Sequence, residues 1–289
     1  MALVTPFLED GSVDWESLQR LLLHVAPHVQ YLVVNGTTAE SATLSHAEQE
    51  AVLHYVLENR QAQVPVVFGL GGNNTASIIE RAKNLPKGVD AILSVTPYYN
   101  KPSQAGIMAH YRALADACPV PVVLYNVPGR TSVNLSADST LALAEHPNII
   151  GIKEASGDME QCMRIIAEAP KGFALISGDD LLTTPLISVG AIGVISVLAN
   201  GIPAYFCQMV NAALNQEFGR AKALVLDMLP LNKLMYQEGN PSGIKTLLEL
   251  IGVCYHHTRL PVVPGTHALR ASIYSELDEL RAKYAELVG

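Results

Sequence analysis

The sequence predicts a (β/α)8 barrel followed by a C-terminal helical extension. Eight short apolar segments rich in β-branched residues alternate with longer helical patterns, and the alternation stops after about residue 203. The length of 289 residues agrees with this fold, because such barrels typically need roughly 250 residues. We therefore expect residues 1–215 to form a catalytic barrel and residues 216–289 to form a helical C-terminal region.

The eight expected strands are apolar along nearly their whole length. This is typical of parallel strands that are covered on both faces, whereas a half-exposed antiparallel sheet shows alternation. They are residues 2–5, 31–34, 64–68, 90–95, 121–125, 149–153, 173–177 and 191–197. Eight such units in succession favour a closed barrel.

Helix signals occupy the gaps between the strands. Ser45 and Glu48 have the spacing of a capping box, Ser136 is placed to cap the helix after strand five, and Asp179 or Asp180 the helix after strand seven. In residues 268–287 apolar side chains recur at spacings of three and four, as on one face of a helix. We expect this last part to pack on the barrel or on a neighbouring subunit.

The composition excludes several classes of protein. With 49% hydrophobic and 16% charged residues a large buried core is expected, and the net charge of -8 argues against nucleic-acid binding. No apolar run reaches the roughly 18 residues that a bilayer requires, and the N-terminus does not resemble a signal peptide, so we expect a cytoplasmic protein. The four cysteines are widely spaced, which predicts reduced thiols, and no histidine pattern predicts a metal site.

Lys153 is the only lysine within an expected strand. In barrels of this type the active-site residues lie at the C-terminal ends of the strands. Burial disfavours an ammonium, so part of the population would be a neutral amine able to form an imine with a ketone. The alternative is a lysine just past the strand end that points into water, and the strand alone leaves both interpretations open.

Other polar side chains stand at neighbouring strand ends. Tyr125 can relay protons, although a core aromatic is the more common role for a strand tyrosine. Thr37 and Thr38 follow a glycine and can hold a carboxylate, although isolated threonines more often cap a helix. Arg130 follows a Pro-Gly turn, where it either grips a substrate carboxylate with two hydrogen bonds or lies in a solvated loop.

Six strand-end motifs occur in one order along nearly the whole chain. They are G-T-T-x-E-S at 36–41, T-P-Y-Y-N-K-P-S at 96–103, Y-N-V-P-x-R-T at 125–131, G-I-K-E-A at 151–155, S-G-D-D at 177–180 and G-V-I-S-V at 193–197. Together they resemble the dihydrodipicolinate synthase (4-hydroxy-tetrahydrodipicolinate synthase) family, within the N-acetylneuraminate lyase superfamily. Ala39 stands where this family usually has glycine.

The resemblance implies a lyase of the lysine and diaminopimelate pathway. It condenses pyruvate, held as an imine on Lys153, with L-aspartate 4-semialdehyde, and the covalent pyruvate replaces any separate cofactor. The resemblance also implies a homotetramer built as a dimer of dimers, in which Tyr99 reaches the adjacent subunit's site. The implied catalytic residues are Lys153, Tyr125, Thr37 and Tyr99, and the implied substrate-binding residues are Thr38, Arg130, Gly178 and the backbone carbonyl of Ile195.

Arg130 distinguishes the synthases from their relatives. The sialic-acid lyases resemble this scaffold but look unlike it at this arginine. Arg130 together with Tyr98 and Tyr99 therefore favours the synthase over a retro-aldolase for N-acetylneuraminate or a 2-keto-3-deoxy acid. A non-catalytic scaffold is the third hypothesis, and it gives no reason to keep lysine, tyrosine and threonines together on neighbouring strand ends.

In feedback-inhibited relatives lysine binds at a subunit interface. By resemblance, that interface would here include Ser41, Ala42, His46, Asn73 and Tyr98. Gln49 and Ser77 replace a histidine and a glutamate of that site. Because the lost carboxylate would pair with the α-amino group of lysine, we expect lysine to inhibit poorly.

Overall fold

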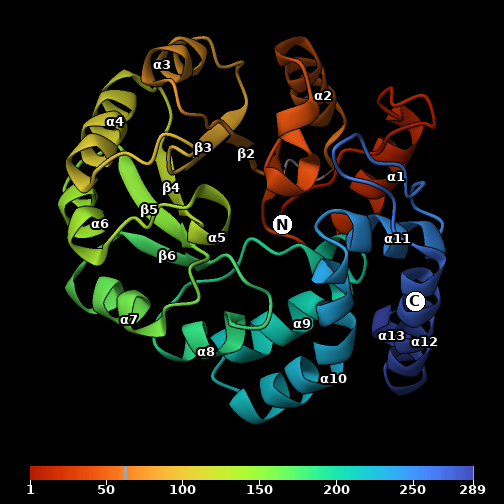
Figure 1. The fold of residues 1–289 in the computed structure, drawn as a ribbon. Coiled ribbons are helices and arrows are strands. Elements are labelled where there is room, and N and C mark those ends of the chain that lie inside the picture. The colour runs from red at the N-terminus through yellow and green to blue at the C-terminus, as the bar shows by residue number, and fades with distance from the viewer. Residues whose placement is uncertain (62–63, 289) are drawn as a thin grey trace. The chain divides into compact units, whose positions relative to one another are not determined.

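The computed structural model describes residues 1–61 and 64–288 (Figure 1). Its chain divides into two compact units. Unit 1 comprises Met1–Val64 and Ser196–Gly289, and unit 2 comprises Pro65–Ile195. The sequence suggested a different boundary, between a barrel over residues 1–215 and a helical region over residues 216–289. That boundary stays a prediction.

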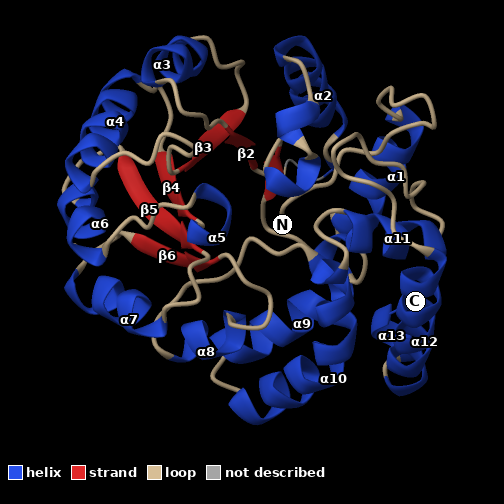
Figure 2. Ribbon diagram, in the orientation of Figure 1, coloured by secondary structure: helices blue, strands red, loops and turns tan. Residues whose placement is uncertain are grey.

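Unit 2 consists of alternating strands and helices (Figure 2). Its strands are β2 (Val66–Gly69), β3 (Val89–Val95), β4 (Val122–Asn126), β5 (Ile149–Glu154) and β6 (Ala174–Ser177). They lie side by side in chain order, and every neighbouring pair is parallel. This order carries the C-terminal ends of β3, β4 and β5 to one edge of the sheet, which is where the sequence placed the chemistry.

The helices of unit 2 follow the strands one by one. They are α3 (Thr75–Lys83), α4 (Gln104–Ala117), α5 (Pro128–Thr131), α6 (Ala137–Ala144), α7 (Met159–Glu168) and α8 (Thr183–Ser188). Helices α3, α4, α6 and α7 contact one another in sequence along one side of the sheet (Figure 2). Ser136 caps α6 as predicted. Asp179 instead accepts from the backbone of Leu181 and Leu182, in the turn before α8.

Unit 1 combines the two ends of the chain. From the N-terminal part it has α1 (Trp15–Val25), β1 (Leu32–Val34), the short 3-10 helices η1 (Thr37–Ala39) and η2 (Ser41–Thr43), and α2 (His46–Asn59). From the C-terminal part it has η4 (Leu198–Asn200), α9 (Pro203–Leu214), α10 (Phe218–Gln237), α11 (Ser242–Leu250), α12 (His267–Lys283) and α13 (Ala285–Val288). The capping box of Ser45 and Glu48 at the start of α2 is confirmed.

The first of the eight expected strands is reduced to a single bridge. Ala2 forms an isolated parallel bridge with Val33. The backbone next to this bridge forms hydrogen bonds with a side chain and not with a neighbouring strand. The side chain of Asn200 donates to the carbonyl of Ala2 and accepts from the amide of Val4. A buried asparagine therefore satisfies the groups that a longer strand would have paired.

The eighth expected strand is also a single bridge, between Val194 and Ser177. Its partner β6 ends at Ser177, where the hydroxyl donates to the carbonyl of Asp179 at 2.8 Å and turns the chain away. Six strands thus remain among the described residues.

The long helix expected over residues 268–287 is interrupted at Tyr284. This residue leaves the helical region (φ -139°, ψ 49°) and separates α12 from α13. Its hydroxyl donates to Asp227 at 2.7 Å, and its ring packs edge-on against Tyr205. Tertiary contacts to α9 and α10 therefore break a helix that the apolar spacing alone continues. Gly289 lies outside the described residues.

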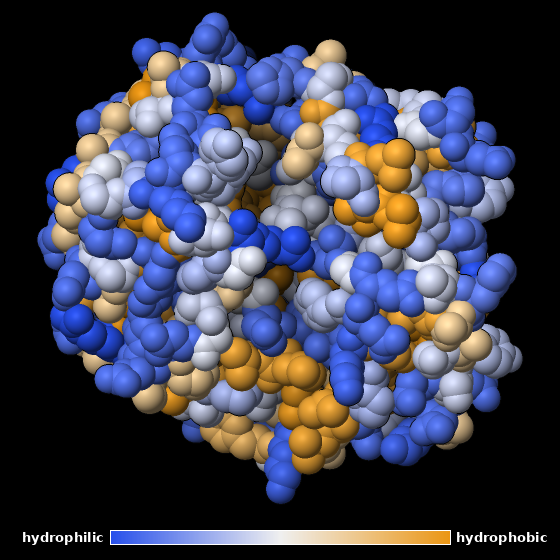
Figure 3. Space-filling view, viewed as in Figure 1, coloured by the Kyte–Doolittle hydropathy of each residue, from blue (hydrophilic) through white to orange (hydrophobic). Residues whose placement is uncertain are grey.

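The apolar side chains gather in the interior of each unit. Leu18, Leu21 and Leu22 of α1 are fully buried in unit 1, as are Ile92, Val122 and Leu124 in unit 2. The visible face of the molecule is mostly hydrophilic, and its hydrophobic residues lie in separate patches (Figure 3). The large core expected from the composition is confirmed.

Candidate active site

Lys153 and Tyr125 lie side by side on adjacent strands of unit 2. They are register partners in the parallel pair of β4 and β5. Both side chains are 6% exposed, and the Nζ of Lys153 lies 4.4 Å from the centroid of the Tyr125 ring. Of the two interpretations of Lys153 left open by the sequence, the buried one is confirmed.

Gly178 gives the lysine side chain the space it occupies. Its amide donates to the carbonyl of Glu154 at 2.7 Å, which holds the turn after β6 against the end of β5. A Cβ at this position would lie 3.1 Å from Cε of Lys153 and 2.6 Å from Cβ of Ala155. Ile195, the last residue of unit 2, is 8% exposed and donates its amide to the carbonyl of Ser177.

Glu154 is a buried carboxylate that sequence reasoning missed. It follows Lys153 on β5, and because side chains alternate along a strand it points to the opposite face. Glu154 is 2% exposed, and its carboxylate accepts from the side chains of Asn126 and Gln161 and from the amide of Ser156. The sequence contained a sign of this pair of polar residues. Asn126 directly follows Tyr125 and Glu154 directly follows Lys153, on neighbouring strands.

This network holds the loop that carries Arg130. Asn126 Oδ1 accepts from the amide of Leu135 at 2.9 Å, and its Nδ2 donates to Asn134 at 2.7 Å. The two ends of the segment 126–135 are thereby joined around α5. Arg130 lies on α5 and is exposed, so its guanidinium is accessible to a ligand.

Tyr98 and Tyr99 follow β3 and are exposed. Tyr98 is 40% exposed and Tyr99 is 89% exposed, and Tyr99 has a φ of 73°, which is rare for a residue other than glycine. Asn73 donates to the carbonyl of Tyr98 at 3.3 Å. The structure therefore brings together two of the residues expected at a lysine-binding interface.

Thr37 and Thr38 form the turn η1 of unit 1. Thr38 is 2% exposed, and its Oγ1 accepts from the side-chain amide of Asn240 at 3.0 Å. Ala39 follows in a right-handed conformation, so no glycine is required there; the left-handed residue is Glu40, with φ 56° and ψ 35°.

The other residues expected at the lysine-binding interface lie near one another in the chain. Ala42 and His46 are exposed and Ser41 is half-buried. Gln49 is 8% exposed, and its Nε2 donates to the carbonyls of Ser41 and Leu44. In unit 2 the amide of Ser77 is used by the cap of α3, where it donates to Asn74.

The cysteines are poor candidates for a nucleophile. All four are free, as predicted. Desolvation and the nearby charge of Glu154 raise the pKa of Cys162 to about 12, and desolvation raises the pKa of Cys254 to about 12. A thiol with such a pKa remains protonated near neutral pH.

Neither a metal-binding cluster nor a membrane-spanning helix occurs among the described residues. Within residues 1–61 and 64–288 no group of three or more His, Cys, Asp or Glu side chains is arranged to hold a metal ion. In the same part of the chain, no helix has both the length and the apolar character needed to cross a membrane.

The chain is similar in sequence to known proteins along nearly its whole length. The sequence model of the "Dihydrodipicolinate synthetase family" matches residues 1–280. The chain is 49% identical over 286 residues to the 4-hydroxy-tetrahydrodipicolinate synthase of Cytophaga hutchinsonii, covering 98% of this chain and 96% of the relative. It is 45% identical over 286 residues to the protein of the same name from Parabacteroides distasonis, with the same coverage of 98% and 96%.

Solved structures agree. The structure of the 4-hydroxy-tetrahydrodipicolinate synthase from Methylacidiphilum fumariolicum has a TM-score of 0.94 at 35% identity, covering 99% of this chain and 96% of that one. The structure of DHDPS from Cyanidioschyzon merolae with lysine bound has a TM-score of 0.92 at 38% identity, covering 96% and 95%. The predicted fold class, a (β/α)8 barrel with C-terminal helices, is confirmed.

Proposed function

We propose that the chain, which belongs to the dihydrodipicolinate synthetase family, catalyses the 4-hydroxy-tetrahydrodipicolinate synthase reaction. It is a lyase that condenses pyruvate with L-aspartate 4-semialdehyde in the lysine and diaminopimelate pathway. One observation carries the proposal at the level of chemistry. A buried lysine amine, 4.4 Å from the ring centroid of a buried tyrosine, stands at the end of a barrel strand in a chain of this family.

The chemistry begins with attack of the neutral amine of Lys153 on the ketone carbon of pyruvate. The carbinolamine loses water to give an imine, and removal of a methyl proton gives an enamine. The enamine carbon then forms a bond to the aldehyde carbon of the second substrate, whose oxygen takes up a proton. Finally the amino group of that substrate displaces the lysine amine and closes the ring. No electrons are exchanged with a redox partner, so covalent pyruvate is the only group that the cycle needs.

We assign the remaining roles as follows. The hydroxyl of Tyr125, whose ring lies beside the amine, transfers protons during formation and breakdown of the carbinolamine, together with Thr37 and Tyr99. Thr37 and Thr38 hold the pyruvate carboxylate, and Arg130 binds the carboxylate of the semialdehyde. Gly178 and the carbonyl of Ile195 line the pocket next to the lysine. Gly178 suits this role because an added Cβ would lie 3.1 Å from Cε of Lys153.

We also propose a homotetramer built as a dimer of dimers. In this assembly Tyr99 enters the site of the adjacent protomer. Its exposure of 89% and its left-handed backbone support this role, because they present a large aromatic side chain to the surface at some conformational cost. Light scattering measures the assembly directly, and a protein that remains monomeric at working concentration while fully active contradicts it.

Lysine is expected to inhibit weakly. The support is the amide at position 49 and the hydroxyl at position 77, neither of which supplies a carboxylate for the α-amino group. An inhibition constant for lysine below the millimolar range would overturn this expectation.

Trapping with borohydride tests the reaction. Treatment with pyruvate and borohydride should add one reduced three-carbon group per chain, located on Lys153 by peptide mass mapping, and Lys153→Arg should abolish the adduct. Arg130→Ala should still trap pyruvate yet lose turnover with the semialdehyde. Absence of any adduct refutes imine chemistry. An adduct combined with turnover of N-acetylneuraminate or a 2-keto-3-deoxy acid, and none of the semialdehyde, refutes the synthase.

A further inference from the structure

Unit 1 contains a second buried lysine, which the reaction does not use. Lys245 lies on α11 and is 0% exposed. Its Nζ is 2.5 Å from Oε1 of Glu40 and donates to the carbonyl of His257 at 2.8 Å. It also lies 4.1 Å from the ring centroid of Phe7, a fully buried residue. The ammonium is thus enclosed by a carboxylate, a carbonyl and an aromatic face.

The partner, Glu40, has an unusual backbone. It ends η1 in the left-handed conformation (φ 56°, ψ 35°), and its amide donates to the carbonyl of Thr37 at 3.1 Å. A side chain with a Cβ adopts this conformation at a cost, so surrounding contacts must enforce it. Glu40 is 5% exposed, so its carboxylate lies inside unit 1, where hydrogen bonds to it can hold the residue in this conformation.

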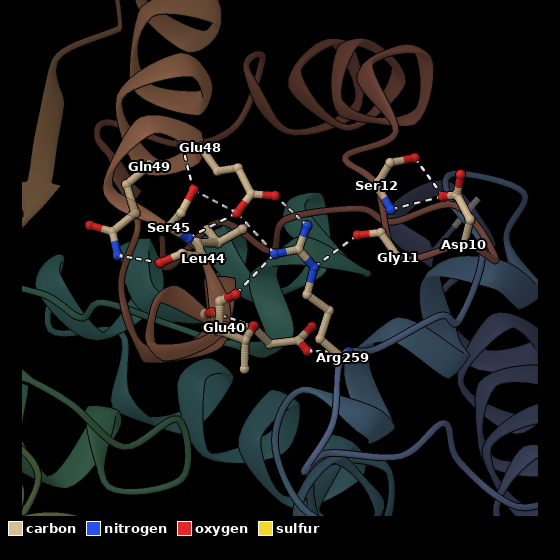
Figure 4. A network of polar contacts seen from close by, with 10 residues as sticks. Asp10, Gly11, Ser12, Glu40, Leu44, Ser45, Glu48, Gln49 and Arg259 are labelled. Carbon is tan, nitrogen blue, oxygen red and sulfur yellow. Dashed lines mark hydrogen bonds and ion pairs between the residues drawn. The ribbon is translucent and has the colours of Figure 1, made fainter.

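Both oxygens of that carboxylate are held by the C-terminal part of unit 1. Oε1 binds Lys245, and Oε2 accepts from the backbone amide of Arg259 at 2.9 Å. The guanidinium of Arg259 then binds the carbonyls of Gly11 and Thr43 and the carboxylate of Glu48 (Figure 4). The turn is therefore fixed at Glu40 and again three residues later at Thr43.

The same region also contacts one of the two threonines directly. Asn240, shortly before α11, donates to Oγ1 of Thr38 at 3.0 Å. The hydroxyl of Thr38 is thereby oriented from one side, while the backbone of Glu40 closes η1 behind it. Helix α11 and its flanking residues thus contact the two-threonine turn at Thr38 and at Glu40.

We propose that Lys245 and Glu40 are positioning residues for pyruvate binding. Their buried ion pair maintains the left-handed turn that aims Thr37 and Thr38 at the carboxylate of pyruvate. The inference rests on the proposed function, in which these threonines bind that carboxylate. It assigns a task to the C-terminal region: residues 245 and 259 set the geometry of a turn near the beginning of the chain.

The test separates binding from chemistry. In Lys245→Met and in the double variant Lys245→Met/Glu40→Gln, the KM for pyruvate should rise roughly tenfold or more, whereas kcat at saturating pyruvate changes less than about threefold. Borohydride should still label Lys153 when pyruvate is saturating. The double variant removes both charges together, which buried pairs tolerate better than loss of one partner, so it remains informative if the single variant does not fold.

Lys283→Met is the matched control. Lys283 forms an exposed ion pair with Asp227 in the same unit, at 3.0 Å, and its loss should leave the KM for pyruvate within about twofold of wild type. A KM unchanged in folded Lys245 variants, or a fall in kcat alone, overturns the positioning role. Failure of the wild-type protein to label Lys153 at any pyruvate concentration instead refutes the proposed function.

Discussion

The two units of this protein each bury a lysine beside an aromatic ring, and the two lysines differ in their partners. Lys153 of unit 2 lies 4.4 Å from the Tyr125 ring and Lys245 of unit 1 lies 4.1 Å from the Phe7 ring. Lys245 contacts Glu40 at 2.5 Å. Among the described residues 1–61 and 64–288, no carboxylate forms an ion pair with Lys153. Burial is common to both, so the carboxylate partner is what distinguishes Lys245 from Lys153, the proposed nucleophile.

The difference follows from how a carboxylate is placed. Glu154 is adjacent to Lys153 in sequence, but strand alternation turns it to the other face, where it binds Asn126 and Gln161. Around Lys245, burial lowers the pKa of the lysine, and the carboxylate of Glu40 opposes that effect. An amine without a carboxylate partner is the better nucleophile, because its lone pair is not committed to holding a proton for an ion pair.

The largest expected effect comes from Lys153→Met. Removal of the amine should abolish borohydride trapping and lower turnover by roughly 10^4-fold or more. The unfolding free energy should be unchanged or higher, because no paired carboxylate is left behind. Steady-state kinetics and urea unfolding measure the two effects. A variant as unstable as Lys245→Met would show that the contrast between the lysines is wrong.

Lys245→Met should have the largest effect on stability. Leaving Glu40 buried without its cation should cost about 3–5 kcal/mol of unfolding free energy. The exposed Lys283→Met control should cost no more than about 1 kcal/mol. Urea unfolding at pH 7 compares them, and equal losses in both variants would count against a special role for the buried pair.

A smaller effect is expected for Gly178→Ala. The added methyl group would lie 3.1 Å from Cε of Lys153 and 2.6 Å from Cβ of Ala155, and such overpacking costs about 1–3 kcal/mol. Displacement of the lysine should also slow trapping of pyruvate. Gly219→Ala in α10 is the control, because its new Cβ meets no atom within 4 Å. If both variants trap pyruvate at the wild-type rate, Gly178 is not needed for the space around the amine.

The smallest effect concerns the partly buried pair of Glu48 and Arg259. The hydrogen bond from Arg259 lowers the pKa of Glu48 from 4.5 to about 2. Because the folded-state pKa is depressed, this stabilisation is present above pH 4.5 and is lost as the pH falls towards 2. Glu48→Gln keeps a side chain suited to the capping box but should flatten that part of the pH profile. Solvent screening limits the change in unfolding free energy at pH 7 to about 1 kcal/mol or less. Urea midpoints at pH 7 and pH 3.5 measure the effect. If their difference is the same in Glu48→Gln as in wild type, the prediction is wrong.

Local sequence patterns determined much of this protein. Six of the eight apolar segments form the parallel strands. The Ser45 capping box begins α2, and the position of Lys153 and Tyr125 at successive strand ends predicted that they are neighbours. These features depend on periodicity and on the register of neighbouring parallel strands, which a short stretch of sequence expresses. The apolar spacing could not show that the last helix is interrupted at Tyr284. The interruption depends on the contacts of Tyr284 with Asp227 and Tyr205, which are distant in the sequence.

Only the tertiary structure decided which carboxylate meets which lysine. Glu154, next to Lys153 in sequence, turns away from it, whereas Glu40 and Lys245 are 205 residues apart and in contact. Sequence placed Lys153 at a strand end but left its burial open, and the tertiary structure shows that it is buried. Packing of α11 against the turn at Glu40 determined the other pair, since contacts between distant segments depend on the shape of the folded chain.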